Sequence, residues 1–133
     1  MDKNLILITG TVTSSSNENV EIYNEVIEIC KKYSNDVYSP LDTMKFKGSN
    51  EERYKRAMEL LQETKLIIAE ISVPSTGQGM ELQEAVRLGI PIIIIAKEGS
   101  KISGLLLGTK NIKSIIYYND IETLKTKLGE ELR

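Results

Sequence analysis

A short glycine-rich stretch followed by a glutamate, at residues 75–81, is the part of the sequence best suited to chemistry. Gly77 and Gly79 stand directly before an expected helix, where glycine lets the backbone approach a ligand closely. The unpaired amides of a first helical turn favour an anion such as phosphate, and Ser75 and Thr76 can add hydroxyl donors. The same two glycines can instead serve a turn that needs a positive φ, so both interpretations stay open.

Two carboxylates flank this stretch. Glu81 falls in the expected first turn of the helix, where the helix dipole stabilises the ionised form, and it can act as a nucleophile or serve helix stability alone. Glu70 closes an apolar strand at the edge where parallel α/β sheets bind ligands, and a carboxylate there needs a partner. An exposed position in water is the alternative for Glu70.

The residue types exclude several kinds of chemistry. The sequence has no histidine, which removes the commonest general base and the commonest transition-metal ligand, so we expect neither a metal nor a cofactor. The single cysteine, Cys30, falls on the apolar face of an expected helix, where it acts as a small hydrophobe.

Charge and hydropathy also limit the partners. The formal net charge of -2 comes from 17 basic and 19 acidic side chains scattered along the chain, so we expect no nucleic-acid binding. No apolar run reaches the roughly 18 residues of a membrane span, and the N-terminus lacks the layout of a signal peptide. We therefore expect no membrane partner and a cytoplasmic location.

Alternating strands and helices must position these residues. Apolar runs predict strands, and residues at helical spacing predict helices between them. The expected strands are 5–8, 36–38, 65–71, 92–96 and 112–117; the expected helices are 19–32, 49–63, one containing Glu81 that stops at Gly89, a turn or helix at 102–107, and a last helix capped by 119–122. A polar loop with Asp42 and Lys45 is expected after Pro40.

This order predicts one α/β domain over residues 1–133. Strands that alternate with helices pair in parallel through right-handed crossovers, and five of them suggest a flavodoxin-like (Rossmann-like), doubly wound sheet ordered 2-1-3-4-5. Ligands then bind where strands one and three diverge, between the loops 10–17 and 72–79.

The sequence of residues 64–108 resembles the nucleoside 2-deoxyribosyltransferase-like superfamily, with the 2′-deoxynucleoside 5′-monophosphate N-hydrolases as the most similar branch. The resemblance is clearest in the string Pro-Ser-Thr-Gly-Gln-Gly-Met-Glu-Leu at 74–82. The resemblance implies hydrolysis of the N-glycosidic bond of a nucleotide or nucleoside, with Glu81 as nucleophile. It also implies a homodimer, in which Ser103 of one subunit contacts the phosphate bound by the other. The implied substrate and phosphate contacts are Gly10, Thr11, Thr13, Ser75, Gly77, Gly79 and Ser103, with Glu70 as a further base or sugar contact.

Three positions depart from the family pattern. The aspartate that assists the leaving base becomes Ala57, a strand tyrosine becomes Leu7, and the phosphate-facing arginine becomes Thr13. Without an acid the base departs slowly, so a nucleotide-binding or sensor protein with impaired catalysis is the alternative, and a deoxyribosyltransferase is a minor one. Candidate replacement acids are Glu59, Glu70 and Asp42, although Glu59 should face away from Ala57 on its helix.

Two smaller questions stay open at this stage. Ile102 to Leu107 offers apolar residues that can fill the core or form a subunit interface. Tyr117 and Tyr118 are expected to end the last strand with one side chain inward and one outward, without a catalytic role.

Overall fold

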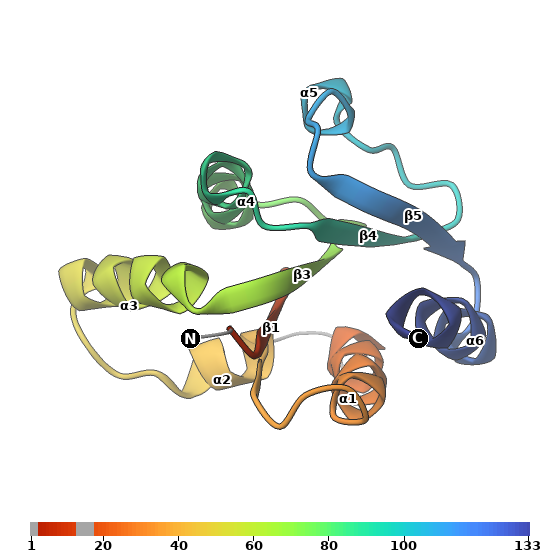
Figure 1. Cartoon of the computed structure of the whole chain (residues 1–133), viewed down its shortest axis with the longest axis horizontal. Helices are drawn as coiled ribbons and strands as arrows, with labels where there is room; N and C mark the ends of the chain where they lie inside the picture. The colour runs from red at the N-terminus through yellow and green to blue at the C-terminus, as the bar shows by residue number, and fades with distance from the viewer. Residues whose placement is uncertain (1–2, 13–17) are drawn as a thin grey trace.

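The computed structural model describes residues 3–12 and 18–133. A five-stranded parallel sheet in the order β2-β1-β3-β4-β5 forms its centre, with helices on both faces (Figure 1), which confirms the predicted topology. The strands are β1 Leu5–Thr9, β2 Val37–Tyr38, β3 Thr64–Glu70, β4 Ile92–Lys97 and β5 Ile112–Tyr118. The helices are α1 Glu18–Cys30, α2 Pro40–Lys45, α3 Asn50–Gln62, α4 Thr76–Leu88, α5 Gly104–Leu107 and α6 Ile121–Leu132.

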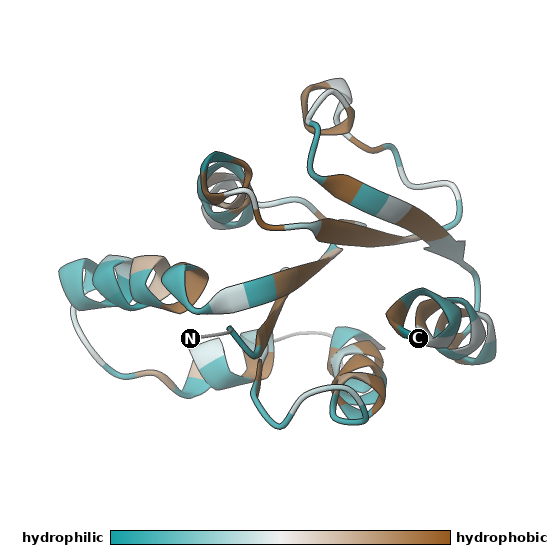
Figure 2. Ribbon diagram, viewed as in Figure 1, coloured by the Kyte–Doolittle hydropathy of each residue, from teal (hydrophilic) through white to brown (hydrophobic). Residues whose placement is uncertain are grey.

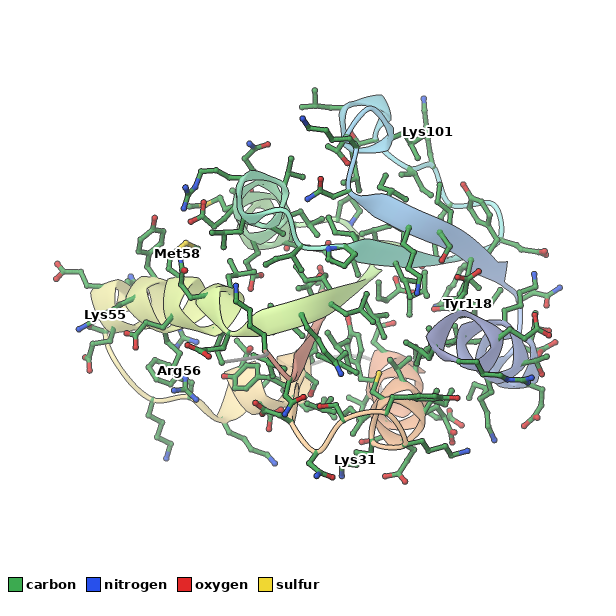
Figure 3. All side chains as sticks on the ribbon, in the orientation of Figure 1. Lys31, Lys55, Arg56, Met58, Lys101 and Tyr118 are labelled. Atoms are coloured by element: carbon green, nitrogen blue, oxygen red, sulfur yellow. The ribbon has the colours of Figure 1, made fainter. Side chains whose placement is uncertain are left out.

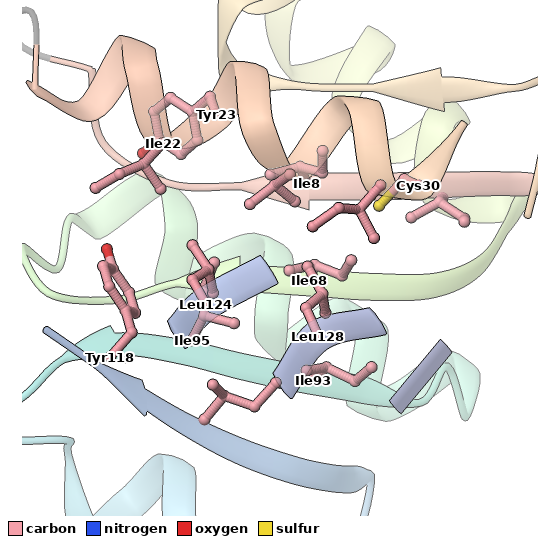
Figure 4. Packing of buried hydrophobic residues seen from close by; sticks show 14 residues of the cluster. Ile8, Ile22, Tyr23, Cys30, Ile68, Ile93, Ile95, Tyr118, Leu124 and Leu128 are labelled. Carbon is pink, nitrogen blue, oxygen red and sulfur yellow. The ribbon is translucent and has the colours of Figure 1, made fainter. Parts of the chain in front are cut away.

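Alternating side chains divide the core between the two faces of the sheet. On β1, Ile6 and Ile8 pack with residues of α1 and α6, whereas Leu7 packs with residues of α3 and α4. Figure 4 shows the first of these clusters, in which Cys30 is fully buried as expected. Since helices cover both faces, β4 is apolar throughout its centre, and Figure 2 shows it as a continuous hydrophobic band.

The helix ends follow the predicted capping signals. Ser49 and Glu52 form a capping box at the start of α3. Gly89 ends α4 with a φ of 74°, the left-handed conformation that favours glycine, and Asp120 caps α6. The strand prediction for the two tyrosines is also confirmed, since Tyr118 is buried and Tyr117 is exposed.

A short helix, α2, replaces the polar loop that we expected after β2. The Asp42 carboxylate accepts a hydrogen bond from the Ser39 amide at 2.9 Å, and the Ser39 hydroxyl accepts one from the Leu41 amide at 3.1 Å. Pro40 occupies the first helical turn, where its missing N–H costs nothing. The loop prediction is wrong because Pro40 not only ends a strand but also starts a helix, and Ser39 and Asp42 have the spacing of a capping box.

No helix in the described part of the chain has both the length and the apolar character needed to cross a membrane.

Gly10 gives a test of how tightly the end of β1 is packed. A Cβ built on Gly10 would lie 2.0 Å from the Tyr23 hydroxyl, and Tyr23 is fully buried. We expect Gly10→Ala to lower the free energy of unfolding by about 1–3 kcal/mol in urea denaturation, the usual cost of overpacking.

Gly129→Ala in α6 is the matched control, because a Cβ there meets nothing within 4 Å. Replacing this glycine by alanine should raise the free energy of unfolding by up to about 1 kcal/mol, because alanine has the higher helix propensity. A Gly10→Ala protein as stable as the wild type would show that Tyr23 can move aside.

Candidate active site

A cavity of about 560 Å³ opens at the carboxyl end of β1, between α2, α3 and the first turns of α4. Its walls are mainly apolar and aromatic, as is typical of sites for small organic ligands. Three charged side chains line it: Glu81, Arg53 and Arg56. This Glu81 cavity lies beside the crossover between β1 and β3, where α/β sheets bind ligands, so it is the candidate active site.

Burial controls the charge of Glu81. The residue lies in the second turn of α4, not in the first as predicted, because the helix already begins at Thr76. The helix dipole acts mainly within the first turn, so it contributes little here. Burial raises the pKa of the Glu81 carboxyl to about 7. The expectation that the dipole holds Glu81 ionised is therefore wrong, and the carboxyl exchanges its proton near neutral pH.

The first turn of α4 offers backbone amides to a ligand. Ser75 caps the helix, since its hydroxyl accepts from the Gln78 amide at 3.3 Å and its carbonyl oxygen accepts from the Gly79 amide at 3.1 Å. Helix geometry gives the amides of Thr76 and Gly77 no partner within α4. Gly77 lines the Glu81 cavity, and a Cβ built on it would meet nothing within 4 Å. An anion such as phosphate suits this position.

Gly77 and Gly79 lie inside α4 rather than in the loop before it. Neither has a positive φ, because the described glycines with that conformation are Gly89 and Gly99. The turn interpretation of the two glycines is therefore wrong. What they provide is open space on the helix surface.

Gln78 fastens α4 to the sheet, and the sequence analysis missed it. Its side chain is buried, and its Nε2 donates to the Thr9 hydroxyl at 3.1 Å and to the Glu70 carbonyl oxygen at 2.9 Å. Thr9 and Glu70 end β1 and β3, so one amide group joins the helix to both strands. The sequence signal was present, since Gln78 precedes Leu82 and Ala85 on the buried face of α4.

The first loop contributes less than expected to the cavity. Gly10 lines it. The Thr11 hydroxyl donates to the Val73 carbonyl oxygen at 2.7 Å, and the Thr11 carbonyl oxygen accepts from the Tyr23 hydroxyl at 2.8 Å. These groups join the loops that follow β1 and β3. Thr13 lies outside the described residues.

Glu70 has internal partners and is buried, so the alternative of an exposed edge position is wrong. Its carboxylate accepts from the Tyr118 hydroxyl at 2.5 Å and from the Ser72 amide at 2.5 Å. Burial, together with the hydrogen bond to Glu70, raises the pKa of the Tyr118 hydroxyl. Glu70 does not line the Glu81 cavity, and its role as a base or sugar contact stays a prediction.

Two of the three positions that depart from the pattern of the resembled family fall on the wall of the Glu81 cavity. Leu7 and Ala57 both line it, and no carboxyl other than Glu81 does so in the described part of the chain. Asp42 is engaged in the cap of α2, and Glu59 is exposed on α3, away from the cavity as expected. None of the candidate replacement acids, Glu70 included, therefore reaches this cavity.

Arg53 and Arg56 bring positive charge into the cavity from α3, and the sequence analysis missed them. The Arg53 guanidinium lies 5.5 Å from the centre of the Phe46 ring, and that of Arg56 lies 5.6 Å from the Tyr38 ring, within the range of cation–π contacts. Figure 3 shows Arg56 projecting from α3 on the side of α2. Their spacing with Ala57, which places all three on one helix face, was the available signal.

A second groove of about 390 Å³ lies between α4 and α5. Ser75, Gly79 and Ser103 line this α4–α5 groove, so one chain divides the expected phosphate contacts between two places. Ser103 makes no side-chain hydrogen bond at the start of α5. Leu105 at the edge of the groove is 88% exposed, whereas Ile102 beside it is buried.

The described residues contain no group of three or more His, Cys, Asp or Glu side chains placed to hold a metal ion.

No family model matches the sequence, but proteins from methanogenic archaea do. A protein from Methanosarcina mazei is 27% identical over 138 aligned residues, which cover 98% of this chain and 85% of the relative. One from Methanococcoides burtonii is 42% identical over 55 residues, which cover 41% of this chain and 45% of the relative, less than half of that protein's length. Both are assigned the name 2′-deoxynucleoside 5′-phosphate N-hydrolase 1.

Solved structures agree on the fold. The CMP N-glycosidase BcmB from Clostridium botulinum superposes with a TM-score of 0.70 at 20% identity, covering 93% of this chain and 97% of the other. A 2-deoxyribosyltransferase from Bacillus psychrosaccharolyticus gives 0.69 at 17% identity, covering 96% and 95%. The chain is thus similar in sequence to these archaeal proteins, and its fold is that of the CMP N-glycosidase and the 2-deoxyribosyltransferase.

Proposed function

We propose that this protein hydrolyses the N-glycosidic bond of a nucleoside 5′-monophosphate or nucleoside, with Glu81 as the nucleophile. The observation that carries the proposal is a half-buried carboxyl in an apolar cavity beside the first-turn amides of a helix, where burial raises its pKa to about 7. The names of the archaeal relatives and of the Clostridium botulinum glycosidase support the same reaction.

The reaction needs one carboxylate on one face of the sugar. The Glu81 carboxylate bonds to the anomeric carbon while the bond from that carbon to the base nitrogen breaks, and the base leaves with the electron pair. Water then hydrolyses the glycosyl ester and releases the sugar and the regenerated carboxylate. The attacking form is the anion, so a pKa of about 7 leaves a large fraction of Glu81 active at neutral pH.

The surroundings of Glu81 fit a nucleotide in size and character. Aromatic rings from Tyr38, Phe46 and Tyr54 line the cavity and suit a planar base. The amides of Thr76 and Gly77 suit the 5′-phosphate. We place the reaction in the cytoplasm.

We also propose a homodimer formed around the α4–α5 groove. An exposed leucine at the edge of a groove with an apolar lining is the surface that a second copy would cover. The family resemblance adds that Ser103 then reaches the phosphate of the neighbouring subunit, which would reunite the two sets of expected phosphate contacts.

A second candidate function is a nucleotide-binding protein with little or no turnover. Ala57 favours it, because alanine on the cavity wall can neither donate a proton nor orient a base. Transfer of the glycosyl group to a second base is the minor alternative, and the lining residues do not favour it over hydrolysis.

Removal of the carboxylate tests the enzyme directly. We expect Glu81→Gln to abolish the release of free base from a panel of ribo- and deoxyribonucleoside monophosphates and nucleosides, followed by chromatography over long incubations, while nucleotide binding persists. In the wild type, kcat/KM should rise as the pH passes through about 7, because the carboxyl must lose its proton to attack.

Glu84→Gln is the matched control, because Glu84 lies on α4 outside the cavity in an exposed pair with Arg87. It should retain activity. Glu81→Gln should stay folded, and its gain in stability over the wild type should grow as the pH rises from 4.5 to about 7 and persist above that pH, because ionisation of Glu81 favours the unfolded wild type. Saturable binding without base release in the wild type would favour the binding-protein alternative.

The phosphate position can be tested without loss of stability. Gly77→Ala adds a methyl group where nothing lies within 4 Å, and alanine favours the helix. We expect an unchanged or higher melting temperature together with an increased KM for monophosphates, but not for unphosphorylated nucleosides. Equal KM values for wild type and variant would place the phosphate elsewhere.

The dimer has its own test. We expect the wild type to show the mass of a dimer by light scattering after size-exclusion chromatography, and Leu105→Lys to show that of a monomer, because a buried lysine charge opposes association. Tyr33→Lys is the control, since Tyr33 is also exposed but lies outside the groove. A monomeric wild type at micromolar concentration would contradict the proposal.

A further inference from the structure

The cavity that holds Glu81 offers no acid for the departing base. The sequence has no histidine, and Glu81 itself, needed as nucleophile, is the only carboxyl on the described cavity wall. Tyr38 and Tyr54 line the cavity, but a phenol is a weak acid that mainly donates a hydrogen bond. A base that receives no proton as the bond breaks must leave as an anion.

Two cations stand on the same wall. Arg53 and Arg56 line the cavity from α3, one helical turn apart and on the face that carries Ala57. The described ion pairs join Arg87 to Glu84 and Lys125 to Glu25 and Glu122, and neither cavity arginine takes part in one. Each guanidinium lies within cation–π distance of a ring, Phe46 or Tyr38, and no described protein group accepts a hydrogen bond from either, so their N–H donors can face a ligand.

We infer that Arg53 and Arg56 bind the departing base and stabilise it as an anion, and that they select bases with two carbonyl oxygens, such as uracil or thymine, over cytosine, in which an amino group replaces one of them. The inference rests on the proposed function, since it names the substrate class of the same site. When the glycosidic bond breaks, both electrons go to the base and spread onto its carbonyl oxygens. The guanidinium groups donate hydrogen bonds to these oxygens and keep their protons. Water protonates the base after it leaves.

Selectivity follows from the donor character of arginine. A guanidinium has five N–H donors and no acceptor, so it pairs with a carbonyl oxygen and leaves an amino group without a partner. Arg53 and Arg56 are exposed on the cavity wall, so a bound base must displace water from their guanidinium groups. A carbonyl oxygen replaces those hydrogen bonds, whereas an amino group does not, which weakens binding and transition-state stabilisation. A pyrimidine with two carbonyls therefore fits this wall better than one with an amino group.

The 5′-phosphate is the other anion that two arginines could hold. The arrangement of the cavity favours the base, because both arginines lie against aromatic rings of β2 and the segment after α2, while the free amides belong to α4. Planar rings stack on bases, and helix amides bind phosphate. The two parts of a nucleotide thus have separate partners.

The experiment compares Arg56→Gln with Lys55→Gln, whose side chain is exposed on α3 and does not line the cavity. Base release is measured for 2′-deoxyuridine 5′-monophosphate, its 5-fluoro analogue, whose base is more acidic, and 2′-deoxycytidine 5′-monophosphate. We expect the wild type to prefer uracil over cytosine by at least about ten-fold in kcat/KM. Arg56→Gln should lower kcat on the uracil substrate by on the order of 100-fold, and less on the 5-fluoro analogue, which needs less stabilisation. Lys55→Gln should match the wild type.

Two results would overturn the inference. An equal loss on all three bases that disappears with unphosphorylated nucleosides would make Arg56 a phosphate contact. A wild type that prefers cytosine would contradict the selectivity.

A protein without any turnover would refute the proposed hydrolysis. Recognition of the base by Arg56 is then tested separately, by the binding of free bases. Titration calorimetry with free 5-fluorouracil and free cytosine should show a preference for 5-fluorouracil in the wild type and its loss in Arg56→Gln. A preference that survives in Arg56→Gln would refute base recognition by the arginine even if the enzyme is active.

Discussion

The buried amide of Gln78 is the contact on which the site depends. It donates to the last residue of β1 and to the last residue of β3, so it fixes the first turn of α4 over the place where the two strands diverge. An unsatisfied buried amide costs about 1–3 kcal/mol, so α4 cannot rotate or shift without losing that free energy. Glu81 lies three residues further along the same rigid helix. The direction of its carboxyl, and the position of the free amides at the helix start, therefore follow from an interaction that itself takes no part in the chemistry.

Placing a carboxyl in this cavity has a cost that catalysis uses. Burial raises the pKa of Glu81 to about 7, which means that the folded protein resists the ionised form that the proposed mechanism requires. A less hydrated carboxylate is also freer to bond to an electron-poor carbon, because fewer water molecules must be displaced. Stability and reactivity are thus opposed at this one side chain, as is common in active sites. Glu70 differs from Glu81 in that the Tyr118 hydroxyl and the Ser72 amide both donate hydrogen bonds to its buried side chain.

The fold could be predicted from the sequence, whereas the walls of the site could be predicted only in part. The strand order follows from local patterns, because apolar runs, capping boxes and Gly89 lie within a few residues of the elements that they define. The partners of the polar residues are distant: Gln78 meets Thr9 across 69 positions, and Tyr118 meets Glu70 across 48. No local pattern pairs such residues. The start of α4 was misplaced for a different reason, since Gly77 and Gly79 indicated a loop by propensity, and the cap at Ser75 overrode them.

The charged side chains of the cavity lie on two different helices, with the carboxyl on α4 and the guanidinium groups on α3. With Glu81 ionised, one carboxylate on α4 and two guanidinium groups on α3 line the same space, and the bond to be broken would lie between them. Positive charge develops on the sugar and negative charge on the base as that bond lengthens, so an anion on the α4 side and cations on the α3 side both favour the separation. A carboxyl at position 57 would stand among the arginines and pair with them, which would weaken it as an acid and them as donors. Under the proposed mechanism, Ala57 and the two arginines are therefore consistent parts of one arrangement, in which electrostatic stabilisation of the base would take the place of proton transfer.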